Sequence, residues 1–316
     1  MVNSMAMLGT YVVDSLNVFF KPRFPLQHGR TYQVELDLTN AYVKLYGKDL
    51  PDSWPAQLVK KINLPAAETI TPPEVLMVYP SSDSIPANQL KFYLVFSRPM
   101  RQVDIYNHIR ILDQKGKAIA APFLELEEGL WDPSGQRLTI WFDPGRIKTG
   151  LQPNLKMGPP LTSGLQYTLV VDKDWEDMNG QPMANNFEKT WTITEADRQQ
   201  PNPTDWKITP PLAASDSPLK IEFPESLDFA MLHSSLAVRR DSGPFLNGTT
   251  SFGPRECSWQ FTPHENWLPG TYFLRISTDL EDLAGNNLNR LFDTNLEIQK
   301  KATLPQTFIE IPLLIK

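Results

Sequence analysis

Two short acidic segments carry oxygen ligands at a spacing that suits a divalent cation. Calcium takes six to eight oxygens from carboxylates and carbonyls. The segments are Asp174-Trp175-Glu176-Asp177-Met178-Asn179-Gly180 and Asp279-Leu280-Glu281-Asp282-Leu283-Ala284-Gly285-Asn286. The EF-hand spacing and its bidentate glutamate are absent, and Asp, Asn and Gly also favour tight turns. We therefore interpret both segments as turns, with Gly180 and Gly285 as structural residues, and expect no metal and no cofactor.

Other groups capable of chemistry are scattered rather than clustered. Glu125 and Glu127 lie two residues apart, and such charges on an outward strand face are usually solvated. Cys257 is the only cysteine, and its alternation with Trp259 and Phe261 predicts a small buried side chain. No metal-ligand spacing, nucleophile elbow or phosphate loop is present, so we expect no enzyme. The histidines with no such spacing are His28, His108, His233 and His264.

Composition excludes further classes of function. The formal net charge of −6 and a pI near 5.3 provide no basic patch for nucleic acid. No window approaches the ~20 apolar residues of a membrane span. The first residues lack a basic segment followed by an apolar one, so no signal peptide is visible. With 29 prolines among 316 residues, the chain favours short strands and many turns over long helices.

The elements that must position these residues recur along the chain. An alternating segment that closes on Phe-x-Pro or a close variant occurs at 16–22, 138–144 and 258–263. A turn glycine, a tyrosine and a second alternating segment follow at 29–34, 164–169 and 270–274. Both patterns are typical of strands. The recurring tyrosines resemble the tyrosine corner of immunoglobulin-like sandwiches, so we predict structural roles for Tyr32, Tyr167 and Tyr272.

Proline clusters between the repeats define the predicted domains. We expect a partial immunoglobulin-like domain at 1–71, two sandwiches at 72–198 and 203–300, and a tail or added edge strand at 301–316. The last strands of the two sandwiches are expected at 189–194 and 293–298. The first unit is short, with about fifteen residues before its Phe-x-Pro strand. Either the sequence is truncated there, or a partner supplies the early strands.

Short alternating strands in units of about 100 residues predict an all-β protein of tandem immunoglobulin-like (fibronectin-III-like) sandwiches. The chain resembles bacterial Ig-like domains of the surface-layer-protein type over roughly residues 74–298. The third unit has Phe223-Pro224-Glu225-Ser226-Leu227 where the second has Phe-Ser-Arg-Pro-Met. The residues that carry the resemblance are Pro80, Leu94-Val95-Phe96-Ser97-Arg98-Pro99-Met100, Tyr167 and Asp282-Leu283-Ala284-Gly285-Asn286.

Aromatic side chains on the outward face of the second unit are the candidate binding patch. Leu90, Phe92, Leu94 and Phe96 alternate toward the core, which leaves Tyr93 on the opposite face. The same reasoning places Trp141 outward on a neighbouring strand. An exposed aromatic patch often marks an interface. Three readings stay open: packing against an adjacent module or the tail, a protein partner, and a glycan ligand.

The sequence therefore favours a non-enzymatic structural or adhesion protein. The resemblance implies an extracytoplasmic setting, in the periplasm or at the bacterial cell surface. The alternative is a glycan- or protein-binding module that uses Tyr93 and Trp141. Nothing in the sequence indicates a nucleic-acid partner, and the oligomeric state is not specified.

Overall fold

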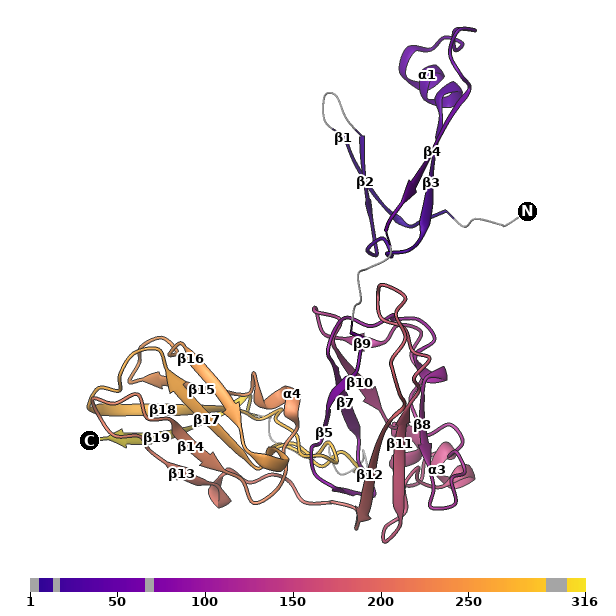
Figure 1. Ribbon diagram of the computed structural model, residues 1–316. Coiled ribbons are helices and arrows are strands. Elements are labelled where there is room, and N and C mark those ends of the chain that lie inside the picture. Colours follow the sequence, from indigo (N-terminus) through magenta and orange to yellow (C-terminus); the bar gives the residue numbers. More distant parts are fainter. Residues whose placement is uncertain (1–5, 14–17, 66–70, 294–305) are drawn as a thin grey trace. The chain divides into compact units, whose positions relative to one another are not determined.

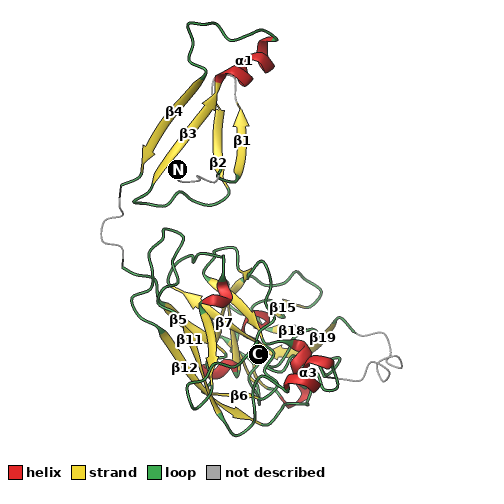
Figure 2. Ribbon diagram, turned by 90° about the vertical axis from the view of Figure 1, so that its right-hand side faces the viewer, coloured by secondary structure: helices red, strands yellow, loops and turns green. Residues whose placement is uncertain are grey.

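The computed structural model describes residues 6–13, 18–65, 71–293 and 306–316. Among the described residues, the longest strands have eight residues and the longest helix has nine, and strands predominate (Figure 2). The chain divides into two compact units. One contains Met1–Glu74, Arg98–Arg101 and Lys173–Ala184, and the other contains Val75–Ser97, Gln102–Asp172 and Asn185–Lys316.

The N-terminal part consists of two separate antiparallel hairpins. Strand β1 pairs with β2, and β3 pairs with β4, but no ladder joins the two pairs in the described residues. Helix α1 connects β3 to β4; Asp37 accepts a hydrogen bond from the Asn40 amide at its start, and Gly47 ends it at φ 64°. The bounds are β1 Gly9–Val13, β2 Val18–Pro22, β3 Thr31–Asp37, α1 Leu38–Tyr46 and β4 Gln57–Asn63.

The middle sandwich is built from two four-stranded sheets. Their strand orders are β5-β7-β10-β9 and β6-β12-β11-β8 (Figure 1; β6 is labelled in Figure 2). All pairs are antiparallel except the short parallel pair β6–β12. The strands are β5 Val75–Tyr79, β6 Ser84–Pro86, β7 Lys91–Phe96, β8 Ile109–Leu112, β9 Leu130–Trp131, β10 Arg137–Trp141, β11 Gln166–Val171 and β12 Phe187–Thr194. Between them lie α2 Pro144–Ile147, α3 Gln152–Met157 and a 3₁₀ turn at Ile105–Asn107.

The C-terminal sandwich repeats this plan with seven strands. Its sheets are ordered β13-β14-β17-β16 and β15-β18-β19. The strands are β13 Lys207–Thr209, β14 Leu219–Glu222, β15 Leu236–Arg240, β16 Gly248–Phe252, β17 Ser258–Pro263, β18 Gly270–Ser277 and β19 Phe308–Ile315. Helix α4 Phe229–Leu232 and two 3₁₀ turns, Pro203–Asp205 and Pro254–Glu256, complete it.

The repeated landmarks occupy the same places in both sandwiches. The Phe-x-Pro strands are β10 and β17, each between two partners in the first sheet. The tyrosine strands are β11 and β18, each between two partners in the second sheet. A four-stranded and a three-stranded antiparallel sheet with this order form the immunoglobulin constant-type plan. The fold is therefore all-β and immunoglobulin-like, as the sequence predicts.

The chain departs from the predicted elements in two places. In the described residues, the last strand of the C-terminal sandwich is β19, at 308–315, at the edge of its sheet and within the segment for which the sequence predicts a tail or an added edge strand. Of the strand expected at 293–298, only Asp293 is described, as a bend, and 294–298 lie outside the described residues. Helix α1 was not predicted, because the repeat places a plain strand connection there. Among the described residues, no helix has the length and apolar character needed to cross a bilayer.

Candidate functional site

Strand β7 places two polar side chains on the face opposite its own core. Phe92 and Leu94 point into the middle sandwich and are fully buried. Because side chains alternate along a strand, Lys91 and Tyr93 point the other way. The sequence places Tyr93 on the outward face, where packing against an adjacent module, a protein partner and a glycan ligand stay open. Only 4% of Tyr93 is accessible, which agrees with packing against an adjacent module and not with an exposed patch. The C-terminal sandwich covers it.

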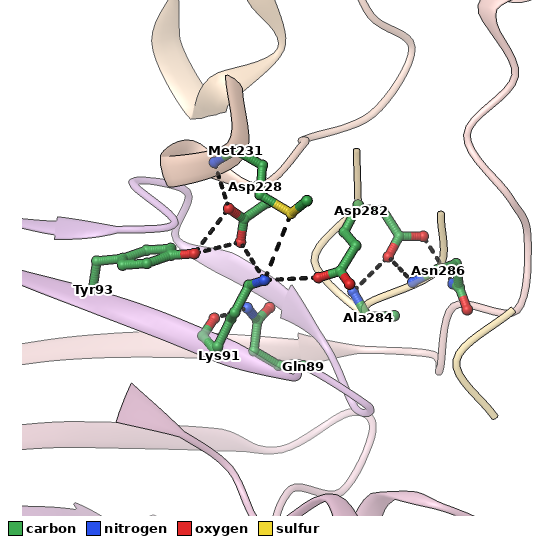
Figure 3. A network of polar contacts seen from close by, with 9 residues as sticks. Gln89, Lys91, Tyr93, Asp228, Met231, Asp282, Ala284 and Asn286 are labelled. Atoms are coloured by element: carbon green, nitrogen blue, oxygen red, sulfur yellow. Dashed lines mark hydrogen bonds and ion pairs between the residues drawn. The ribbon is translucent and has the colours of Figure 1, made fainter. Parts of the chain in front are cut away.

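Lys91 and Tyr93 meet two carboxylates of the C-terminal sandwich (Figure 3). Lys91 Nζ lies 3.3 Å from Asp228 Oδ2 and 2.7 Å from Glu281 Oε2. The Tyr93 hydroxyl donates to the carboxylate of Asp228, at 2.8 Å from Oδ1 and 2.7 Å from Oδ2. Asp228 also accepts from the Met231 amide at the start of α4. One buried carboxylate thus binds a cation, a phenol and a helix end.

Charge compensation explains why these groups tolerate burial. The side chains of Lys91 and Asp228 are 10% and 4% exposed, and isolated charges at such sites carry a large desolvation cost. Burial lowers the pKa of Lys91, but the carboxylates of Asp228 and Glu281 outweigh it, so the pKa is raised overall. Burial and Asp228 both raise the pKa of the Tyr93 hydroxyl. The lysine therefore stays charged and the tyrosine stays protonated.

Further contacts, made by both backbone and side-chain groups, join the same two sandwiches on either side of this network. The Leu90 amide donates to the Leu283 carbonyl at 2.9 Å, within the second acidic segment. The Ser81 amide donates to Glu256 Oε2 at 2.9 Å, and the Arg255 amide donates to Ser81 Oγ. Tyr79 stacks on Phe229 with ring centroids 3.5 Å apart. We call this set of contacts, together with the Lys91 network, the junction.

Both acidic segments form the turns that the sequence predicts. Asp177 Oδ1 accepts from the amides of Asn179 and Gln181. Asp282 Oδ1 accepts from the amides of Ala284 and Asn286 in the same way. Gly180 and Gly285 each have φ 81°, which favours glycine. The first aspartates, Asp174 and Asp279, are exposed and do not join these turns.

The second turn lies beside two further carboxylates. Asp197 follows β12, and Glu225 follows β14. One carboxylate oxygen from each of these residues and one from Asp282 all lie within 4.8 Å of one another. Burial, together with Asp197, raises the pKa of Glu225 to about 7. Burial and the same neighbours raise the pKa of Asp282 to about 8, although bonds from Asn286 oppose the shift. Three carboxylates this close can share a proton or hold a hard cation such as calcium.

Trp141, the second residue of the predicted binding patch, and the three predicted structural tyrosines lie as follows. Trp141 is half-buried, and Lys91 Nζ lies 5.3 Å from its ring centre. The Tyr32 hydroxyl accepts from the Gln27 amide, and the Tyr272 hydroxyl exchanges hydrogen bonds with the backbone of Leu268. Both contacts tie the tyrosine to upstream backbone, as in a tyrosine corner. Tyr167 is buried and pairs with Trp191 across the ladder.

Of the remaining reactive side chains, His233 lies at the junction, where its ring meets Phe229 edge-on with centroids 5.0 Å apart. Cys257 is half-buried rather than buried, because it ends a 3₁₀ turn just before β17 and its Sγ lies near Ser226 and the Arg255 carbonyl. Glu125 and Glu127 are exposed in a loop, not on a strand as expected. His28 and His264 are exposed.

Sequence reasoning singled out Tyr93 but missed its partners in the junction, Lys91, Asp228 and Glu281. Lys91 has an aligned counterpart, Lys220, which is exposed on β14, so residue type alone did not distinguish them. One signal was present. Arg98 and Glu225 occupy equivalent positions after Phe96 and Phe223, and this exchange of a cation for a carboxylate marks the two turns as chemically different.

Comparison with known proteins gives distant structural likeness only. No family model matches the chain, and no curated protein is detectably similar in sequence. A native alpha-2-macroglobulin structure from Escherichia coli is 11% identical with a TM-score of 0.25, covering 64% of this chain and 65% of that one. The S-layer protein SbsC is 11% identical with a TM-score of 0.27, covering 78% of this chain and 41% of that one. The N-terminal eight Ig domains of DSCAM are 11% identical with a TM-score of 0.23, and the match covers 96% of this chain and 34% of that one. This chain thus spans less than two thirds of the length of each of these proteins.

Proposed function

We propose that this chain is a non-enzymatic structural or adhesion protein of the bacterial cell surface or periplasm, in which the middle and C-terminal sandwiches act as one rigid spacer. The buried junction around Lys91 is the observation that carries the proposal. The extracytoplasmic setting rests on the sequence resemblance to surface-layer Ig-like domains.

Burial of charge is what makes the junction rigid. Domains joined by a short linker move relative to one another by default, unless their interface is large or strongly held. Opening this junction would separate Lys91 from both carboxylates and leave Tyr93 without its acceptor. Removing one member of a buried ion pair typically costs about 3–5 kcal/mol. The two sandwiches are therefore expected to move as one body.

The use of these polar groups favours a structural over a catalytic role. A catalytic acid, base or nucleophile must reach a substrate atom. Lys91, Tyr93 and Asp228 instead contact one another and the start of α4, and each is buried. Their hydrogen bonds and ion pairs hold the two sandwiches together.

The experiment measures the distance distribution across the junction. Spin labels on Thr190→Cys and Thr249→Cys, in the Cys257→Ser chain, place one probe on an exposed position of each sandwich. We expect a single narrow distribution. Asp228→Asn should broaden it, because the neutral side chain retains the helix cap but no longer binds Lys91 as an ion pair.

Glu222→Gln is the matched control, since Glu222 forms an exposed ion pair with Lys207 in the same sandwich. It should leave the distribution narrow. A broad distribution in the otherwise unsubstituted labelled chain would refute the rigid spacer.

A further inference from the structure

Lys91 differs from the other lysines that form ion pairs in the described residues. Its side chain is 10% exposed, and it has two carboxylate partners, Asp228 and Glu281, whose side chains are 4% and 21% exposed. Lys189 and Lys207 each have one partner, and that partner is largely exposed. A lysine amine becomes a nucleophile once it loses a proton. An amine enclosed with two carboxyl groups can therefore do more than form ion pairs.

The carboxyl group of Asp228 is held in a way that suits attack by an amine. Its Oδ1 accepts hydrogen bonds from the Met231 amide at 2.9 Å and from the Tyr93 hydroxyl at 2.8 Å. Its Oδ2 lies 3.3 Å from Lys91 Nζ. Figure 3 shows this carboxyl group between the phenol, the helix amide and the ammonium. Two fixed donors on Oδ1 are the arrangement that stabilises the negative charge of a tetrahedral intermediate.

Glu281 supplies the proton acceptor that the amine requires. Its Oε2 lies 2.7 Å from Lys91 Nζ, which is direct hydrogen-bonding distance. Lys91 carries a proton at rest, so a reaction begins when that proton moves to Glu281 and leaves a neutral amine beside Asp228. The Glu281 side chain is also the most exposed of the three, so a small molecule released here can leave on its side.

The surroundings favour condensation of the amine with the carboxyl group over hydrolysis of the product. Lys91 and Asp228 are 8% and 3% exposed as whole residues. The Trp141 ring centre and the Met231 sulfur lie 5.3 and 3.9 Å from Lys91 Nζ, so bulk water has little access. Condensation also replaces two buried charges by a neutral amide, which removes the cost of keeping those charges out of water. Reactants that folding holds side by side no longer have to meet by diffusion.

We propose that Lys91 and Asp228 form an isopeptide bond that joins the middle and C-terminal sandwiches covalently. Glu281 passes the first ammonium proton to Oδ2, and Nζ attacks Cγ, so that negative charge collects on Oδ1. Glu281 then takes a second proton from the nitrogen and delivers it to Oδ2 as the Cγ–Oδ2 bond breaks. The products are one water molecule and one secondary amide, which keeps the third proton on nitrogen. Glu281 ends as a carboxylate. The bond rests on the proposed spacer, because the two sandwiches must stay docked for it to form.

The mass of the denatured full-length chain tests the bond. We expect a mass lower than that of the sequence by one water molecule, and a proteolytic digest that contains a branched peptide joining residue 91 to residue 228. Lys91→Arg keeps a positive charge beside both carboxylates but lacks the nucleophilic amine, so it should have the full mass. Lys220→Arg is the matched control at the aligned, exposed position, and it should keep the water loss.

Glu281→Gln tests the role of the proton acceptor. General acid–base catalysis typically contributes about 10²–10⁴-fold, so newly synthesised Glu281→Gln chain should lose water at least about 100-fold more slowly than the natural chain. Time-resolved mass spectra after pulse labelling measure this rate. An equal rate in the two chains would overturn the mechanism.

The outcomes separate the bond from the spacer. A full mass in the natural chain, a water loss confined to a single unbranched peptide, or a water loss that survives Lys91→Arg would overturn the bond. A full mass with a single narrow distribution between the labels at positions 190 and 249 would overturn the bond and leave the rigid spacer standing. A branched peptide with a broad distribution would confirm the bond and refute rigidity. The branched peptide in the natural chain decides the question even if Lys91→Arg fails to fold.

Discussion

The two acidic turns have the same local structure and different surroundings. Asp177 and Asp282 accept the same pair of amide hydrogen bonds, and each forms a single β-bridge to the residue two positions after Arg98 or Glu225. In the first turn, Arg98 lies 3.5 Å from the buried Asp177. In the second turn, the equivalent Glu225 and the nearby Asp197 surround Asp282 with negative charge.

The adjacent glutamates differ in the same way. Glu176 forms an ion pair with Arg101 at 3.0 Å, and both side chains are substantially exposed. Its equivalent, Glu281, binds the buried Lys91 across the junction. The same loop sequence thus carries an exposed ion pair in one place and an ion pair that docks two sandwiches in the other. The local sequence determines the turn, and the neighbouring surface determines its role.

The largest difference between the turns should come from removing the cation that each glutamate binds. Lys91→Met should lower the free energy of unfolding by about 3–5 kcal/mol, because it leaves Asp228 buried without a counter-charge. Arg101→Met should cost less than about 1 kcal/mol, since exposed ion pairs contribute little. Urea denaturation of both variants measures this. Equal costs would mean that the junction is not a buried ion-pair site.

The turn glycines provide the second comparison. A Cβ at position 285 would lie 2.3 Å from Leu90 Cδ2, whereas a Cβ at position 180 would have no neighbour closer than 3.8 Å. Both positions have positive φ, so each alanine costs about 1 kcal/mol in backbone strain. Gly285→Ala should cost about 1–3 kcal/mol more, because the overpacking displaces Leu90. Thermal melts should separate the two variants; matching melts would argue against close docking of the second turn.

The carboxylate cluster should make stability depend on pH. The pKa values of Asp282 and Glu225, about 8 and about 7, lie above their unfolded values, so folding favours the protonated forms. The stabilisation is complete below about pH 4 and is lost as the pH rises through about 8. Because each pKa unit corresponds to about 1.4 kcal/mol, we expect the free energy of unfolding to fall by several kcal/mol, on the order of 4–7 kcal/mol at most, between pH 5 and pH 9.

Glu225→Arg should reduce this dependence, because it restores the cation found beside Asp177. The melts are recorded in EDTA, so that a bound cation does not mask the effect. Arg98→Glu is the reciprocal variant and should destabilise the first turn at neutral pH. A Glu225→Arg chain that is less stable than the natural chain at pH 9 would contradict the predicted repulsion.

The sequence predicted what depends on alternation and missed what depends on docking. The Phe-x-Pro strands, the tyrosine positions and the outward direction of Tyr93 all follow from period-two patterning. The burial of Tyr93 does not, because Asp228 comes 135 residues later in the chain. The cluster of Asp197, Glu225 and Asp282 was unpredictable for the same reason. The last strand of the C-terminal sandwich is expected at 293–298, whereas β19 lies at 308–315, inside the segment predicted as a tail or added edge strand, because the connection after β18 is longer than its counterpart in the middle sandwich.

The separation of Lys91 from its partners has a consequence for biosynthesis. A ribosome makes β7 long before it makes Glu281, which lies 190 residues further along. During that interval the middle sandwich presents an unpaired ammonium and a phenol beside apolar side chains, and this surface is finished only when the C-terminal sandwich emerges and folds. Because the middle sandwich is translated first, its surface around Lys91 stays uncovered until the C-terminal sandwich folds. A nascent chain whose translation stalls between the two sandwiches therefore exposes a surface that a chaperone can bind.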